Sequence, residues 1–559
     1  MRAVRNFMSS LRNRFLKHDE IIIFTAAFLI EIAFALLLID KYGGTFLAGD
    51  SVDHTYIARV AVDNGIYSGL AALTGVWLPM FPLLEIPFVM VDTLYTTGLS
   101  GTIVNAAMTG GIAVYIYKII GGVRENRFAI LAPLLFLSNI YTLIYGATPM
   151  SEQTAIFFLT LACYYFKRYW HDNSIKEFIK CSIALVFGSL SRYEIWSVAL
   201  FVAFIFVVNE VKNHKLYRVA YAWLPVIGIV SWLFIEYMIR NDPLIFIHDP
   251  QSAQTQSSQF PPYFKENLLL TLSHSYAQMY SLLGIGVYFL FLMLIPLFIL
   301  KKDELIPFSL FIVPILFQII LMFKGTSLGW LRHFYLMMPL FVIVITYSLE
   351  SIYSIATAFV KITANLKLTY ITGIFFVLFI PVAIVGQNGQ GINQELKPWI
   401  ITGFDIPNER ISPNLNVKNT DIVWATDLDI EYGAKNRSNY LKIKNLIGNE
   451  KILVPIISDP YNNRYLPVYG RISPSQIIDP WDYLEYNNIM ERPWDYVTYV
   501  MISPKPNDSW NAIYNNWFKG KFYLFNYYYN DDWKSEFLSY YSPIFEDEGF
   551  TLFKLKKEK

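Results

Sequence analysis

The sequence predicts a polytopic α-helical membrane protein with a C-terminal domain of mixed α/β structure. Of its 559 residues, 54% are hydrophobic and only 16% are charged, whereas an average soluble domain carries about 25% charge. Eleven apolar stretches approach or reach the ~20 residues that a helix needs to cross a bilayer. Residues 387–559 contain no such stretch, and their composition shifts toward Gln, Asn, Gly and Pro.

The expected crossings are separated by short charged segments. They lie near residues 20–40, 99–118, 128–147, 152–168, 177–191, 195–210, 219–239, 278–300, 305–323, 334–349 and 367–386. The stretch 76–95 is apolar too, but three prolines and two carboxylates interrupt it, so we expect an interfacial segment there. These assignments predict a transmembrane domain over residues 1–386, with a first external loop over 41–98, and a second domain over 387–559.

The distribution of Lys and Arg predicts the orientation, because these residues accumulate in short cytoplasmic loops. With the N-terminus inside, the inner segments hold nineteen of them and the outer loops hold seven. The basic flank and long apolar run of the first crossing suit an uncleaved anchor in the cell membrane. An odd number of crossings then places the C-terminal domain outside the cytoplasm.

The C-terminal domain has short strand-like runs that alternate with helix-like segments. We expect strands at 421–425, 452–457, 497–503 and 522–525, a closing hairpin over 543–555 and a helix over 509–518. The whole chain has a net charge of +1, which gives no electrostatic reason to expect a nucleic-acid partner. Its two cysteines, Cys163 and Cys181, lie in apolar stretches, so neither a disulfide framework nor a cysteine metal site is expected.

An ionisable residue close to the hydrocarbon core costs free energy, so we treat such residues as candidates for a functional site. The first cluster is Gly49-Asp-Ser-Val-Asp-His54 with Ala58-Arg59. If the segment is helical, Asp50 and His54 are four residues apart and share a face. A carboxylate beside an imidazole suits general-base catalysis or a metal ion. The alternative is that Asp50 merely caps an interfacial helix.

Three more clusters lie on the same predicted side. Glu152 follows Thr148-Pro-Met-Ser, Arg192 and Glu194 belong to Ser191-Arg-Tyr-Glu-Ile-Trp196, and Arg332 and His333 belong to Gly329-Trp-Leu-Arg-His-Phe-Tyr335. A planar guanidinium below the membrane surface suits a phosphate. Structural alternatives stay open for each: a helix-dipole role for Glu152, an ion pair between Arg192 and Glu194, and interfacial anchoring by Arg332. Together the clusters predict an enzyme that acts on a lipid-linked substrate.

These motifs, together with Val76-Trp-Leu-Pro-Met-Phe-Pro82, resemble the C-type (GT-C) superfamily of integral-membrane glycosyltransferases. The resemblance covers roughly residues 20–340. It is closest to archaeal and bacterial members of the branch that contains protein mannosyltransferases and aminoarabinose transferases. One departure is Ser51, where the mannosyltransferases usually have Glu.

The resemblance implies transfer of a sugar, such as mannose, from a polyprenyl or dolichyl phosphate to a glycan, protein or lipid acceptor, with inversion. It implies that Asp50 is the catalytic base, and it matches Glu152 to the acidic residue of the second external loop and Arg192 to the donor-phosphate residue. His54 joins the catalytic group, and Arg59, Glu194, Arg332 and His333 are the remaining substrate-binding candidates. No cofactor is required, although a divalent ion bridging Asp50, His54 and Glu152 stays open.

Other functions remain as alternatives. The sequences Pro480-Trp-Asp-Tyr483 and Pro493-Trp-Asp-Tyr496 partly match the acceptor-reading motif of oligosaccharyltransferase catalytic subunits, without its second Trp and its Gly. A lipid or solute transporter would place its site near the membrane midplane, often in repeated halves. A non-catalytic subunit or receptor is the third alternative.

Overall fold

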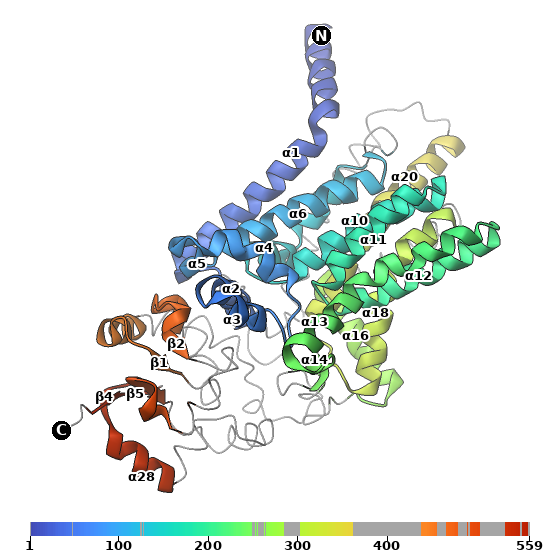
Figure 1. Cartoon of the computed structure of the whole chain (residues 1–559). Coiled ribbons are helices and arrows are strands. Elements are labelled where there is room, and N and C mark those ends of the chain that lie inside the picture. The colour runs from blue at the N-terminus through green and yellow to red at the C-terminus, as the bar shows by residue number, and fades with distance from the viewer. Residues whose placement is uncertain are drawn as a thin grey trace.

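The computed structural model shows a helical bundle with a small sheet domain at one end (Figure 1). The residues that it describes are 2–46, 49–122, 126, 128–248, 252, 254, 262, 264–283, 302–360, 438–454, 466–478, 489, 492–502, 531–547 and 550–556. The N-terminal helix and the C-terminal sheet lie at opposite ends of the molecule (Figure 1). The predicted class of polytopic helical protein with a C-terminal α/β domain is confirmed, whereas the expected boundary near residue 387 lies outside the described residues.

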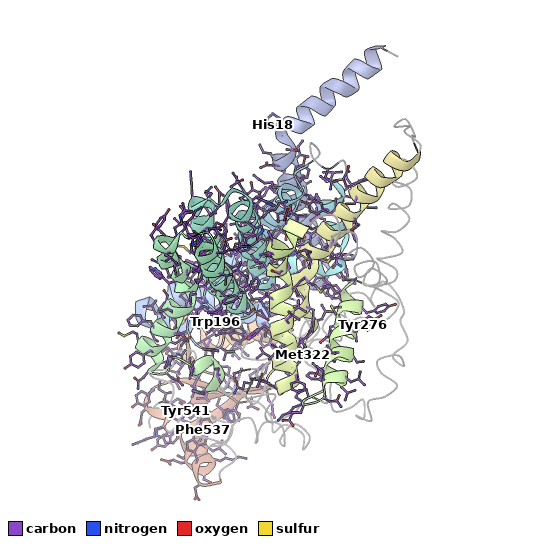
Figure 2. All side chains as sticks on the ribbon, turned by 90° about the vertical axis from the view of Figure 1, so that its right-hand side faces the viewer. His18, Trp196, Tyr276, Met322, Phe537 and Tyr541 are labelled. Carbon is purple, nitrogen blue, oxygen red and sulfur yellow. The ribbon has the colours of Figure 1, made fainter. Side chains whose placement is uncertain are left out.

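The bundle is formed by helices of very different length. They are α1 (Arg2–Tyr42), α6 (Leu99–Ile119), α8 (Leu131–Ser138), α9 (Ile140–Ala147), α10 (Glu152–Asp172), α11 (Ile175–Ser189), α12 (Glu194–Lys212), η1 (Leu216–Val226), α13 (Ile227–Arg240), α14 (Ile245–His248), α16 (Leu268–Leu283), η2 (Lys302–Glu304), α18 (Leu305–Lys324), α19 (Leu331–Phe334), η3 (Tyr335–Met337) and α20 (Met338–Val360). Helix α1 bends at His18, whose φ and ψ of −130° and 15° are not helical, and Figure 2 shows His18 at that bend.

Six helices in the described part of the chain are long and apolar enough to span a membrane. They cover His18–Tyr42, Leu99–Ile119, Glu194–Lys212, Leu216–Arg240, Leu305–Lys324 and Leu331–Ser351. Exposed apolar side chains cover much of this bundle, among them Phe204, Trp223 and Phe234. An apolar exterior of this extent is typical of a surface that contacts a membrane or another protein.

The expected crossings at 128–147, 152–168 and 177–191 are not among these six. The stretch 128–147 forms two helices, because Asn139 is extended and its side chain caps α9 by accepting from the Tyr141 amide at 2.9 Å. Helix α11 has 15 residues, or about 22 Å. Helix α10 is long enough but carries Lys167 and Arg168 in its second half. The stretch 278–300 is described only to residue 283, and 367–386 lies outside the described residues.

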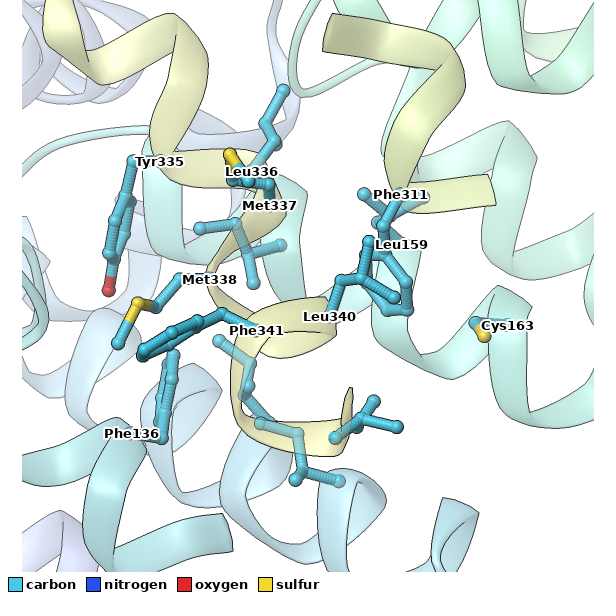
Figure 3. Close-up of a cluster of buried hydrophobic side chains, with 14 of the residues drawn as sticks. Phe136, Leu159, Cys163, Phe311, Tyr335, Leu336, Met337, Met338, Leu340 and Phe341 are labelled. Carbon is cyan, nitrogen blue, oxygen red and sulfur yellow. The ribbon is translucent and has the colours of Figure 1, made fainter. Parts of the chain in front are cut away.

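Helix α20 lies at the centre of the bundle. Figure 3 shows Phe341 beside Phe136 of α8, and Leu340 beside Leu159 of α10 and Phe311 of α18. These five side chains are at most 6% exposed. The helix that follows Arg332 and His333 is therefore fixed on several sides by the apolar core.

The first loop forms four short helices between the bundle and the tail (Figure 1). They are α2 (Gly49–Asp63), α3 (Gly65–Ala72), α4 (Met80–Val89) and α5 (Asp92–Thr97). The expected interfacial segment 76–95 thus contains only a ten-residue helix and the start of α5. At about 1.5 Å per residue, α4 spans about 15 Å, half of a hydrocarbon core.

In the described residues of the tail, five strands form a sheet in the order β2-β1-β3-β5-β4. Its elements are a helix over 438–447, β1 (Ile452–Leu453), η6 (Pro474–Gln476), β2 (Ile477–Ile478), η7 (Pro493–Asp495), β3 (Tyr499–Ile502), α28 (Asp531–Tyr540), β4 (Tyr541–Asp547) and β5 (Phe550–Leu555). Strand β1 runs parallel to β2 and β3, while β5 is antiparallel to β3 and β4. The predicted closing hairpin is present as β4 and β5, and β1 and β3 lie within the strands expected at 452–457 and 497–503; segments 421–425, 509–518 and 522–525 lie outside the described residues.

The tail packs directly on the first loop. One buried cluster, here called the docking cluster, contains Phe46, Val52, Ala58, Val89 and Tyr95 from the first part of the chain and Tyr440, Ile443, Ile447, Ile452 and Tyr469 from the tail, among others. The Phe46 and Tyr469 rings meet edge to face with centroids 6.2 Å apart. Helix α2 is therefore held between the bundle and the tail.

Candidate active site

The start of α2 forms an ion pair with the segment before α20. Arg332 Nη1 donates to Asp50 Oδ2 at 2.5 Å, and the Arg332 guanidinium lies 4.1 Å from the centre of the Trp330 ring. Gly329 allows this approach, because its φ of +67° belongs to the left-handed region that glycine favours. The structure thus brings together two residues that the sequence places in separate clusters.

Arg192 is the centre of a second group of contacts. It donates from Nη1 to Glu152 Oε1 at 2.6 Å, and from Nε and Nη2 to the two oxygens of Glu194 at 3.2 and 2.9 Å. His333 Nδ1 lies 2.5 Å from Glu194 Oε1 and 3.2 Å from Arg192 Nη2. The predicted ion pair between Arg192 and Glu194 exists, and it is part of a larger buried network.

Short turns of the chain place these charges. Helix α11 ends at Ser189, and the Arg192 amide still donates to the Gly188 carbonyl at 3.1 Å. Helix α12 begins two residues later with Glu194, so both side chains lie where the end of α11 meets the start of α12. The fork of a guanidinium matches the two oxygens of a carboxylate, which fixes the Arg192 plane.

Asn105 holds the loop that precedes Glu152. From the middle of α6, its amide donates to the carbonyls of Thr148 at 2.6 Å and Met150 at 2.7 Å. A Cβ added at Gly101 would lie 2.5 Å from the Pro149 side chain, so the loop rests against α6. Asn105 was not among the predicted site residues. The sequence signal that could have indicated it is a polar side chain within the predicted apolar crossing 99–118.

His54 lies buried between the two ion-paired groups. It is 3% exposed, and its ring contacts Trp77 and Phe81 with centroid distances of 5.7 and 5.4 Å. Its Nδ1 atom has no hydrogen-bond partner among the described residues.

Burial lowers the pKa of His54 to about 4, against the opposing charges of Asp50 and Glu152 and with further lowering by Arg332 and Arg192. The electrostatic field of all four residues acts on this imidazole. His54 is therefore neutral near pH 7, with one ring nitrogen as a hydrogen-bond donor and the other as an acceptor.

Arg192 keeps its charge although it is buried. Burial alone lowers the pKa of its guanidinium, but Glu194 and Glu152 raise it, and the net effect is an increase above the ordinary value. The second oxygen of Glu152, Oε2, has no hydrogen-bond partner among the described residues. Since a buried acceptor without a donor is costly, this oxygen is available to a ligand hydroxyl.

The three residues considered for a divalent ion do not form a ligand set. Within the described ranges, no group of three His, Cys, Asp or Glu side chains has an arrangement that could hold a metal ion. Asp50 and Glu152 each accept from an arginine instead. The residues as arranged do not fit the ion.

Arg59 does not join this group. It donates to Asp63 at 2.8 Å, to Asp92 at 2.9 Å and to the Val89 carbonyl at 2.6 Å. Nine residues separate it from Asp50 on α2, which corresponds to about 13–14 Å. Arg59 therefore lies apart from the Arg192 network, and its expected role in substrate binding stays a prediction.

A buried carboxylate beside the site was not predicted. Glu85 is fully buried in α4 and accepts from the hydroxyls of Thr55 at 2.8 Å and Ser100 at 2.6 Å. In the sequence, Glu85 only interrupts an apolar stretch. Through Thr55, Glu85 fixes the face of α2 that follows His54.

The second Trp-Asp-Tyr sequence has a packing role in the tail. Pro493–Asp495 forms the 3₁₀ helix η7, and Trp494 is 7% exposed. Its ring stacks on Tyr540 at 4.9 Å between centroids. The copy at 480–483 lies outside the described residues.

One family model matches the chain. Residues 92–238 match the dolichyl-phosphate-mannose-protein mannosyltransferase family; this is about a quarter of the chain and includes Glu152, Arg192 and Glu194. No curated protein matches the chain. The match, the apolar helices and the resemblance of the motifs support a membrane glycosyltransferase of the mannosyltransferase-like GT-C type.

Proposed function

We propose that this protein transfers a hexose such as mannose from a polyprenyl or dolichyl phosphate to an acceptor at the outer face of the cell membrane, with inversion. The acceptor is a protein, a glycan or a lipid. The single observation that carries the proposal is the assembly of Asp50, Glu152, Arg192 and Arg332 into one partly buried region around His54. These residues come from four segments of the chain and include two ion pairs of 2.5–2.6 Å.

Asp50 is the base of this reaction. It takes the proton of the acceptor hydroxyl while that oxygen bonds to the anomeric carbon from the side opposite the phosphate. The bond between the anomeric carbon and the phosphate oxygen breaks, and its electron pair leaves with the polyprenyl phosphate. One displacement inverts the anomeric centre and needs no separate acid, because the phosphate leaves as an anion.

The two arginines stabilise the departing phosphate. Because Arg332 binds Asp50 and Arg192 binds Glu152 and Glu194, both guanidinium groups are already directed and charged before the donor enters. Preorganised cations of this kind stabilise a transition-state anion more than mobile ones. When the donor phosphate binds Arg332, it releases Asp50 to act as a base.

The test is sugar transfer from mannosyl phosphoryl polyprenol by membranes that contain the full-length protein. Asp50→Asn keeps the shape but removes the basic oxygen, and we expect a loss of about 10²–10⁴-fold in rate. Arg192→Lys keeps the charge but loses the fork, with an expected loss of about 10²–10³-fold.

Asp303→Asn is the matched control, because Asp303 is exposed and lies beside Glu304, which pairs with Lys167 near the far end of α10. Normal transfer by Asp50→Asn, at equal protein abundance, would contradict the mechanism. Transfer only from a lipid-linked oligosaccharide would favour the oligosaccharyltransferase alternative. Solute uptake that both active-site variants retain, without any transfer, would favour a transporter.

A further inference from the structure

A polar pocket lies between the first loop and the tail, away from the Asp50 region. It has a volume of about 250 Å³, and Arg59, Asp92 and Thr96 line it from the first loop, with Lys444, Arg471 and Ser473 from the tail. In Figure 1 the segment that carries β1 and β2 lies next to α2 and α5. The volume is slightly below the ~300–1,000 Å³ of sites for drug-sized ligands, so the pocket suits one small group.

Two of the cations in this pocket are not neutralised. Arg59 is paired with Asp63 and Asp92. Lys444 donates only to neutral groups in the described part of the chain, the Gly448 carbonyl at 3.1 Å and Gln476 Oε1 at 2.7 Å. Arg471 is exposed, and the described residues include no partner for it. The pocket therefore carries positive charge that a ligand can neutralise.

The backbone at Arg471 is unusual for an arginine. Its φ is +54°, in the left-handed region that non-glycine residues rarely adopt. The Gly470 amide donates to the Leu466 carbonyl, and the Ile472 amide donates to the Pro467 carbonyl, so Arg471 holds the helix-ending position where glycine is common. A side chain in a strained position often has a functional reason.

We propose that this pocket binds an acidic sugar, with its carboxylate or phosphate held by Arg471 and Lys444. The hydroxyls of Thr96 and Ser473 lie among the lining groups and meet ring hydroxyls. Within the proposed function, on which this extension rests, the sugar belongs to the acceptor, and Asp50 lies about 13–14 Å along the same helix. Binding itself does not depend on transfer and is measurable in the Asp50→Asn protein.

The test is calorimetric titration of the full-length protein in lipid nanodiscs with glucuronate, glucose 6-phosphate, glucose and inorganic phosphate. We expect one of the acidic sugars to bind with a Kd at least about tenfold below those of glucose and of phosphate alone. Which acidic sugar binds distinguishes a carboxylate from a phosphate. Arg471→Gly should weaken that binding about tenfold while its Tm is unchanged or higher, because glycine relieves the backbone.

Lys442→Gln is the control, since Lys442 lies on the same tail helix, donates to Asn439 and does not line the pocket. It should bind as the wild type does. Three results would overturn the proposal: no saturable binding of either acidic sugar, equal affinity for glucose, or unchanged binding by Arg471→Gly. Equal affinity for inorganic phosphate and for the sugars would also overturn it, because the neutral groups of the pocket would then make no contribution.

Discussion

At the scale of single residues, Arg192 explains how several isolated charges become one site. Its guanidinium contacts Glu152, Glu194 and His333, which lie on three different helices. Removing one partner of a buried ion pair typically costs 3–5 kcal/mol, so each contact also constrains the helix that supplies it. Substitutions here affect both stability and reaction, and abundance must be measured beside rate.

Because of His54, we expect the folded state to lose stability at acid pH. Burial lowers its pKa to about 4 from 6.5, so its stabilising effect is complete above pH 6.5 and is lost as the pH falls through 4. The difference corresponds to about 3 kcal/mol. We expect His54→Gln to lose less stability than the wild type between pH 7 and 4.5, as measured by thermal unfolding. His248→Gln, at an exposed His paired with Asp242, is the control, and equal acid losses in wild type and His54→Gln would contradict the assignment.

The candidate residues were predictable, but their partners were not. Charges beside apolar runs indicated Asp50, Glu152, Arg192 and Arg332 without any knowledge of the fold. The pairing of Arg332 with Asp50 depends on how α19 meets α2, and no local pattern encodes that contact. Asn105 and Glu85 were missed because a single polar residue in an apolar segment gives no sign of what it will bind.

At the scale of elements, α2 connects the site, the bundle and the tail. Its first turn carries Asp50, its middle carries His54 and Thr55, and its far end carries Ala58 and Arg59. Helix α4 fixes the middle through Glu85, while the docking cluster fixes the far end. The position of Asp50 therefore depends also on contacts made farther along α2.

Because of Glu85, we expect the folded state to lose stability as the pH rises. Burial raises its pKa to about 7 from 4.5, against the hydrogen bonds of Ser100 and Thr55. The stabilisation is present below pH 4.5 and is lost as the pH rises through 7. We expect Glu85→Gln to be more stable than the wild type at pH 8 by up to about 3 kcal/mol and nearly equal at pH 5. Thermal unfolding at pH 5 and pH 8 checks this prediction. Glu536→Gln in the tail is the control at an exposed position. A lower Tm for Glu85→Gln than for the wild type at pH 8 would contradict the prediction.

The docking cluster makes a separate prediction. Tyr469→Ala removes the ring that meets Phe46, and loss of a buried aromatic side chain typically costs 3–5 kcal/mol. We expect the tail to be cleaved faster in limited proteolysis and sugar transfer to fall, although Tyr469 lies outside the Asp50 region. Tyr496→Ala is the control because Tyr496 is 58% exposed. A variant with unchanged proteolysis would show that the tail does not depend on this contact.

At the scale of the whole molecule, the composition predicted a helical membrane protein correctly, but several of the predicted membrane crossings differ from the helices in the structure. The apolar fraction indicates membrane helices reliably, because few other environments tolerate it. It does not reveal where a run breaks: Asn139 divides one expected crossing in two, and α11 is too short to cross alone. In the tail, β2 contains only two residues. A strand of this length is too short to show an alternation of polar and apolar residues in the sequence.

Orientation is testable with a single labelled cysteine. Cys163 and Cys181 are both buried, so the background in intact cells should be low. We expect Ser539→Cys, at an exposed position of α28, to react with a membrane-impermeant maleimide in intact cells. Ser9→Cys should react only after permeabilisation, because the basic N-terminus is predicted to be cytoplasmic. The reverse pattern would contradict the proposed location of the sugar transfer.

The ion pair between Asp50 and Arg332 joins residues 282 positions apart. During synthesis at ~5–20 residues per second, roughly 15–60 s pass between the appearance of the first residue and that of the second. Helices α6 to α18 are synthesised in that interval, before α19 and α20. The charge cluster is therefore one of the last features of the bundle to form, and a chain that stops just before Arg332 contains most of the bundle helices but cannot form this ion pair.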